Sequence, residues 1–148
     1  MTRTSTVLKA TLAAAALSLS AGAALAKDWF LAVHVDQNDP QVINMALNNV
    51  QNAIAYFEEK GDTVTVEVVA YGPGLHMYVD GKSPVADRIA AMSLEHDTLT
   101  FSACGNTIAG MEKKTGQKVS LLSEAGVVPS GVARLMELQD EGYTYIRP

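Results

Sequence analysis

The chain has 148 residues, 48% of them hydrophobic, and its 11 Lys and Arg against 16 Asp and Glu give a formal net charge of -5. Because no basic cluster interrupts this acidic balance, nucleic acid and anionic membranes are poor partners for it. The length suits a single domain whose core is large enough to fold without disulfides or metals.

The first 26 residues are expected to be a cleaved signal peptide. Arg3 and Lys9 precede an apolar, alanine-rich stretch without acidic residues, and Ala24–Ala26 has the small-x-small form of a signal-peptidase site. The predicted mature chain is therefore one domain, 27–148, with no membrane anchor, although an uncleaved membrane helix is the alternative. The alanine-rich leader is of a bacterial type, so we expect a periplasmic protein.

The first half of the mature chain alternates strand and helix patterns. Asp28–Val35 is a short apolar run and predicts a buried strand. Apolar residues then recur at helical spacing over 38–61, with Pro40 suited to the first helical turn. The β-branched run Thr63–Ala70 predicts a second strand, and the glycines and proline that follow predict a loop over 71–83.

The second half repeats the alternation. A helix is predicted to begin with Ser83 and Pro84 as its cap, and a third strand at Thr98–Ala103. A short helix capped by Asn106 or Thr107 should follow, and then a fourth strand. That fourth strand is expected at 118–122.

The last helix is expected within 127–142, with one side formed by Val132, Leu135, Met136 and Gln139. The terminal segment 143–148 is predicted to be an edge strand. Strands separated by helices imply crossover connections, so the sequence predicts an α/β fold with a mostly parallel sheet and helices on both faces.

Ligand sites in such folds lie at the carboxyl ends of the strands. The first predicted strand ends at His34 and Asp36, the second leads into the loop that carries His76, and the third ends at Cys104. If these three strands are neighbours, the three side chains share one rim.

Cys104 is the only cysteine in the chain. An exported protein meets an oxidising compartment, where an odd cysteine indicates a reactive thiol or an intermolecular bond. Cys104 precedes a predicted helix, whose free N–H groups and partial positive charge favour a thiolate. Gly105 allows a tight turn there, and Asn106 or Thr107 could donate to a bound group. The alternative is that the cysteine only fills space in the core.

His76 is a candidate general acid or base, or a partner that holds a thiolate as an ion pair, and the alternative is a loop histidine packed for shape. His34 is expected to be a satisfied histidine of a strand. A metal site could be imagined from these two histidines, Cys104 and Asp36, but the close ligand pairs typical of zinc sites are absent, so no metal is expected. The loop over 71–76 lacks the phosphate-binding patterns of nucleotide sites, and no cofactor is expected.

Four segments, "HVDQNDPQVINMALNNVQN", "VEVVAYGPGLHMY", "FSACGNT" and "VVPSGVARLMELQDEGYTYIRP", together resemble the DsrE/DsrF-like family, in its branch of small exported members. The resemblance covers essentially the whole mature chain, which would make 27–148 a DsrE-like domain. It implies a three-layer α/β/α sandwich around a parallel sheet of about five strands. It also implies homo-oligomers, as trimers or hexamers, and sulfur carried as a persulfide on a cysteine, for which Cys104 is the candidate.

The leading hypothesis is a periplasmic sulfur-handling protein, a sulfur carrier or sulfurtransferase whose donor and acceptor the sequence does not name. Cys104 would accept sulfane sulfur and His76 would assist proton movement. The expected substrate-binding residues are Gly72, Gly74, Gly105, Asn106 and Thr107. The alternatives are a non-catalytic oligomeric module that binds a small ligand or metal at the same rim, and a purely structural assembly subunit.

Overall fold

A computed structural model describes residues 25–148, so the expected signal peptide lies outside the described residues except for Leu25 and Ala26. Within this range the chain forms one five-stranded sheet in which every pair of neighbouring strands is parallel. The strand order is β4-β3-β2-β1-β5. The strands are β1 Asp28–Val35, β2 Thr63–Ala70, β3 Leu99–Cys104, β4 Ala125–Val128 and β5 Thr144–Ile146.

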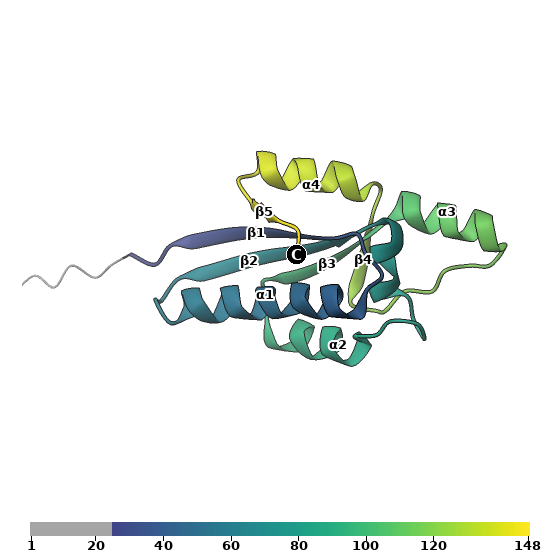
Figure 1. Cartoon of the computed structure of the whole chain (residues 1–148). Coiled ribbons are helices and arrows are strands. Elements are labelled where there is room, and N and C mark those ends of the chain that lie inside the picture. The colour runs from purple at the N-terminus through teal and green to yellow at the C-terminus, as the bar shows by residue number, and fades with distance from the viewer. Residues whose placement is uncertain (1–24) are drawn as a thin grey trace, which may run out of the picture.

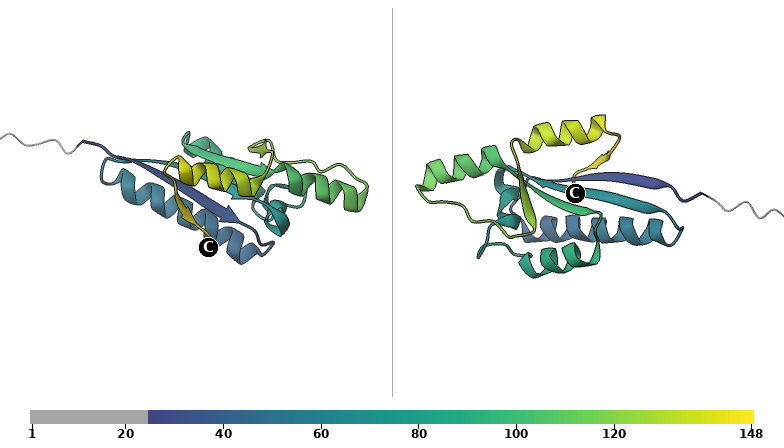
Figure 2. Two further views of the ribbon diagram at one scale, coloured as in Figure 1. Left: turned by 90° about the horizontal axis from the view of Figure 1, so that it is seen from above. Right: turned by 180° about the vertical axis from the view of Figure 1, so that it is seen from behind.

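Helices cover both faces of the sheet, which makes the predicted three-layer α/β/α sandwich (Figures 1 and 2). The helices are α1 Pro40–Glu58, α2 Ala86–Glu95, α3 Gly105–Thr115 and α4 Gly131–Asp140, and a 3-10 helix, η1, spans Gly72–Tyr78. α1 and α2 lie on one face and α4 on the other, while α3 extends outward from the carboxyl ends of the strands (Figure 1). The fold class expected from the sequence is confirmed.

The main core lies between the sheet and the pair α1 and α2. Successive side chains of the central strands point to opposite faces of the sheet. Every second one points to this face, where it packs against the buried side of α1. α1 starts cleanly because the Asp39 carboxylate accepts a hydrogen bond from the Gln41 N–H and Pro40 fits the first turn. The buried residues of α1 are Ile43, Ala46, Leu47, Val50 and Ile54.

The opposite face has a much smaller apolar cluster beneath α4. Its buried members are Ala32, Val69, Leu135 and Leu138. Polar residues occupy other positions on this face, and among them Glu67 is paired in register with Ala32 and with Thr100. The Glu67 carboxylate forms an ion pair with Arg134 of α4, so polar contacts as well as apolar packing hold α4 over the sheet.

Several element boundaries differ from the sequence-based prediction. The fourth strand is not 118–122 but β4, because only an isolated bridge between Val79 and Leu121 forms in the predicted segment. α2 begins at Ala86, since the Ser83 hydroxyl accepts from the Val85 N–H in a turn that precedes the helix. The predicted loop 71–83 contains η1.

The start of α3 and the buried side of α4 also differ from the prediction. Cys104 itself is the N-cap of α3, so the cap is neither Asn106 nor Thr107. The predicted side of the last helix is wrong as well: Leu135 is buried together with Leu138, whereas Val132 and Met136 are exposed.

Candidate thiol site at the carboxyl edge of the sheet

Cys104 is the last residue of β3 and the N-cap of α3. The three strands β1, β2 and β3 are adjacent, as the sequence-based reasoning assumed, so their carboxyl ends form one rim. Cys104 is only 5% exposed and forms no disulfide. The rim therefore holds a single, nearly covered thiol.

The thiol faces the N-termini of two helices. Backbone N–H groups of Thr107 and Asn106 reach it from the first turn of α3, and the N–H of Gly131 reaches it from the start of α4. Burial raises the pKa of the Cys104 thiol, but hydrogen bonds from the Thr107 side chain and from these amides outweigh it, so the pKa falls below its ordinary value. The Asn106 N–H contributes least, and it also donates to the Pro129 carbonyl at 3.2 Å. The site thus favours the nucleophilic thiolate.

Thr107 connects the thiol to the start of η1. Its Oγ1 donates to Cys104 and accepts a hydrogen bond from the Gly72 N–H at 2.9 Å. Gly72 adopts a positive φ of 54°, a backbone conformation that glycine reaches most readily. The Gly-Pro-Gly segment and the thiol are therefore joined through one hydroxyl group.

Gly131 fits closely beside the thiol because it has no side chain. A Cβ at this position would lie 3.0 Å from Cδ1 of Tyr71 and 3.2 Å from Cβ of Cys104. Tyr71 follows β2 and so lines the same rim. A larger residue would crowd Tyr71 and Cys104, so the groups around the thiol would have to shift.

Besides Gly72, two glycines were predicted to bind substrate, Gly74 and Gly105, and both lie close to backbone atoms of other segments. A Cβ at Gly74 would collide with the Val35 carbonyl at the end of β1. A Cβ at Gly105 would lie 3.1 Å from the Val128 carbonyl oxygen. Gly74 is buried, and its position fixes η1 against the sheet.

His76 lies on η1 and lines an open pocket of about 420 Å³. The pocket extends between η1 and the Thr107 face of α3, with Lys114 at the far end of that helix. Its lining residues are Asn38, Gly72, Pro73, His76, Thr107, Gly110, Met111 and Lys114. Cys104 is not among them, and the pocket meets the thiol through Thr107.

His34 lies on β1 and is buried, with a 4% exposed fraction. Its Nδ1 is 2.8 Å from the Tyr145 hydroxyl, and its ring centroid is 4.4 Å from that of Tyr71. Within residues 25–148 its Nε2 has no hydrogen-bond partner, so the expectation of a fully satisfied histidine is wrong. Burial lowers the pKa of His34 below its ordinary value of 6.5, although the Asp36 carboxylate opposes this shift.

The structure brings some of the predicted site residues into one chain of contacts and separates others. Cys104, Thr107 and Gly72 are linked directly, and His76 shares a pocket with the last two. His34 lies at the end of β1 on the same rim, where its ring packs against Tyr71.

Sequence reasoning missed Gly131 and Tyr71. The pair Ser130–Gly131 did carry a usable signal, because Ser130 caps α4 by accepting from the Ala133 N–H. With the fourth strand misplaced, this helix start was not expected beside Cys104.

Comparison with known proteins agrees with the fold. A family model described as the DsrE/DsrF-like family matches residues 10–148. The chain belongs to the DsrE/DsrF-like family. Among solved structures, this DsrE/DsrF-like chain is similar to a protein of unknown function, MTH1491 from Methanobacterium thermoautotrophicum, at 30% identity and a TM-score of 0.70. The match covers 82% of this chain and 100% of that one. A search of curated proteins found no match.

Two further features of residues 25–148 bear on the alternatives. None of the helices described there is both long and apolar enough to cross a membrane. In the same range, no three side chains of His, Cys, Asp or Glu come close enough together to hold a metal ion.

Proposed function

We propose that this protein is an exported sulfur-handling protein that carries sulfane sulfur as a persulfide on Cys104. Membership of the DsrE/DsrF-like family suggests a sulfur-related role. The observation that carries the finer proposal is the thiol enclosed by the N-terminal amides of α3 and α4, because these amides stabilise the attacking thiolate.

The proposed reaction is nucleophilic attack of the Cys104 thiolate on the outer sulfur of a small donor. With thiosulfate, a new S–S bond forms at Cys104, the S–S bond of the donor breaks, and sulfite leaves with the bonding electron pair. With a polysulfide, the leaving group is the shortened polysulfide anion. The small exposed fraction of Cys104 favours such compact inorganic donors over bulky ones.

The pocket beside Thr107 is the proposed approach for the donor. Lys114 and His76 give it cationic and proton-donating groups in an otherwise acidic chain, which suits an anionic donor. His76 would assist the leaving group, and the backbone around Gly105 and Asn106 would surround the terminal sulfur of the persulfide.

The place of action and the assembly are part of the proposal. We expect cleavage after Ala26, a periplasmic protein of residues 27–148, and association into trimers or hexamers. Mass spectrometry of the protein recovered from a periplasmic fraction tests the first expectation, and light scattering tests the second. The full preprotein found in the cytoplasm would contradict export.

The direct test of the reaction is release of sulfite from thiosulfate. Wild type is expected to release about one sulfite per thiol in a single burst, because the persulfide blocks a second attack, whereas Cys104→Ser should release none. Equal release by both proteins, or by neither, would contradict the proposal.

A second candidate function is supported by the pocket itself, since His76 lines it and Cys104 does not. In this alternative the protein binds a small anion without chemistry. Calorimetry with thiosulfate would then give the same affinity for Cys104→Ala as for wild type, and a lost signal for His76→Ala. The carrier proposal instead predicts a heat of reaction that disappears with Cys104.

A further inference from the structure

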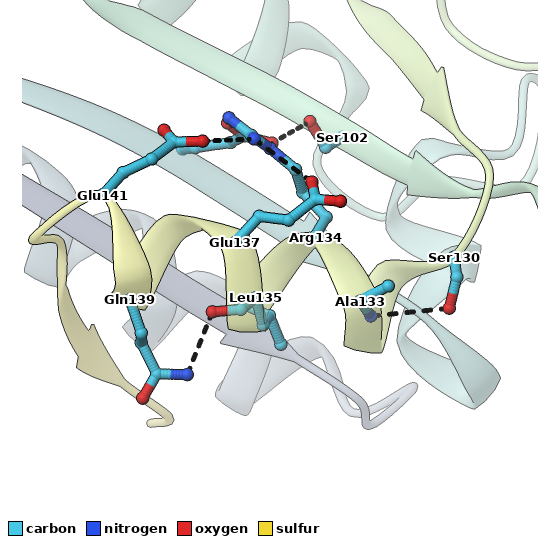
Figure 3. A network of polar contacts seen from close by, with 9 residues as sticks. Ser102, Ser130, Ala133, Arg134, Leu135, Glu137, Gln139 and Glu141 are labelled. Carbon is cyan, nitrogen blue, oxygen red and sulfur yellow. Dashed lines mark hydrogen bonds and ion pairs between the residues drawn. The ribbon is translucent and has the colours of Figure 1, made fainter.

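The face of the sheet beneath α4 contains a buried ion pair that the proposed reaction does not use. Glu67, in the middle of β2, is 6% exposed and receives the guanidinium of Arg134 from α4. Nη2 of Arg134 lies 2.8 Å from Oε2 of Glu67, and Nε lies 3.0 Å from Oε1. The Ser102 hydroxyl donates to Oε1 of the same carboxylate at 2.6 Å (Figure 3). The pair is thus bidentate and tied to two strands.

Arg134 lies one helical turn after Gly131, the residue whose N–H faces the thiol. The Arg134 N–H also donates to the Ser130 carbonyl at 2.9 Å, which closes the first turn of α4. The ion pair therefore anchors the same turn that presents the Gly131 amide. Ser102, on the other side of the carboxylate, is two residues before Cys104 on β3.

Apolar packing fixes the later turns of α4 more firmly than the first. The buried apolar side chains of the helix, Leu135 and Leu138, come after its first turn, and Gly131 has no side chain to pack. A small shift of the first turn would move the Gly131 N–H away from the sulfur while the rest of the helix stayed in contact with the sheet.

We propose that the Glu67–Arg134 ion pair is a positioning device that holds the Gly131 N–H against the thiol of Cys104, an inference that rests on the proposed role of that thiol. The pair touches neither sulfur nor donor. It acts by fixing the first turn of α4 on β2 and β3, and so it sets how much of Cys104 is thiolate.

The sign of one substitution separates positioning from a simple charge effect. Through space, loss of the negative charge in Glu67→Gln favours the thiolate and lowers the pKa of Cys104. Loss of positioning removes an N–H donor from the thiolate and raises the pKa. Other titratable groups near the thiol are Tyr71, which contacts Gly131 beside it, and His34 behind that ring, and neither is changed by the substitution.

The experiment measures the rate of alkylation of Cys104 by iodoacetamide across pH, since only the thiolate reacts. Glu67→Gln and Arg134→Lys, which keeps the charge but loses the bidentate fork, are both expected to raise the pKa of Cys104. The rate at a fixed pH below that pKa should fall by about threefold to tenfold, because one pKa unit changes the thiolate fraction about tenfold. Glu112→Gln is the matched control: it breaks the ion pair with the exposed Lys118 and should leave the profile unchanged.

Unchanged or faster alkylation in both variants, with native circular dichroism, would overturn the inference. Because changes to a buried pair can prevent folding, a second measurement uses the wild type and the milder Ser102→Ala. The amide proton shift of Gly131 in NMR spectra is expected to follow the titration of Cys104 in the wild type, with a smaller amplitude in Ser102→Ala. An amide proton shift of Gly131 that does not change as Cys104 titrates would also overturn the inference.

Sulfur uptake is measured separately, so the two proposals can fail independently. Wild type that takes up no sulfur, while the variants still shift the pKa of Cys104, would refute the carrier function alone. Sulfur uptake with a thiol pKa that the ion pair does not affect would refute the positioning role alone.

Discussion

The backbone N–H of Gly131, at the start of α4, faces the thiol of Cys104, at the end of β3. Two helix N-termini thereby converge on one sulfur atom, and each contributes free N–H groups and partial positive charge. This relationship explains how backbone groups help to lower the pKa of a nearly buried thiol.

Gly131→Ala tests the close approach. The added Cβ meets Tyr71 and Cys104, so the first turn of α4 must move outward, and the pKa of Cys104 is expected to rise. The free energy of unfolding should fall by about 1–3 kcal/mol. Alkylation rates across pH and thermal unfolding measure the two effects.

Gly110→Ala is the matched control for this substitution. Gly110 is exposed on α3, and a Cβ added there would have nothing within 4 Å, so alanine should stabilise the helix by about 1 kcal/mol and leave the thiol pKa unchanged. The same thiol profile in both alanine variants would contradict the geometry described for Gly131.

Thr107→Val tests the hydroxyl that joins η1 to the thiol. Valine keeps the shape but removes the donor to Cys104 and the acceptor for the Gly72 N–H, so the pKa of Cys104 is expected to rise. Thr107→Ser keeps the hydroxyl and should react like the wild type. Alkylation at a fixed pH compares the three proteins, and equal rates would show that the hydroxyl does not matter.

Gly74→Ala is expected to be destabilised by about 1–3 kcal/mol, because its Cβ would collide with the Val35 carbonyl in a backbone contact that cannot relax locally. Denaturant unfolding measures this cost. Native stability combined with lost sulfur uptake would instead return Gly74 to a role in substrate binding.

His34 should make stability depend on pH. Its folded pKa is lower than its unfolded pKa, chiefly through burial, so the unfolded chain binds a proton first as pH falls. The contribution of His34 is complete above the unfolded value near 6.5 and is lost as pH falls below it. Asp36, Arg147, Tyr71 and Tyr145 surround the ring and remain in His34→Gln, which should show a flatter loss of stability between pH 7 and about 5. An equally steep loss in that variant would refute the assignment.

The central strands and the first helix could be predicted from the sequence because their signals are local. The runs Asp28–Val35 and Thr63–Ala70 are parallel strands, the first buried only in its second half, and their apolar and β-branched composition predicted their bounds to the residue. Pro40 likewise marks the first turn of α1. The position of Cys104 at a strand end before a helix was readable for the same reason.

The fourth strand could not be predicted reliably. The apolar residues of 118–122 match a strand pattern as well as β4 does, and β4 contains a glycine and an exposed Val127 because it lies at the sheet edge. Its true place follows only from pairing with β3. The contact of Gly131 with Cys104 depends on that pairing, so local sequence patterns could not predict it.

The side-chain contacts on the α4 face of the sheet could not be predicted from the sequence either. Glu67 interrupts an apolar strand, and its partner Arg134 is far away in the sequence, so only the packed structure pairs them. His34 was expected to be satisfied, but one of its nitrogens is left without a partner by the packing of Tyr71 and Tyr145 around the ring.

The intact mass of the protein after brief exposure to thiosulfate or to polysulfide tests the central claim most directly. The account predicts that the wild type gains the mass of one sulfur atom from thiosulfate and of one or more from polysulfide, that a reductant removes the gain, and that Cys104→Ser shows none. No gain on a folded wild type whose thiol also resists iodoacetamide would contradict the role of Cys104 as a sulfur carrier.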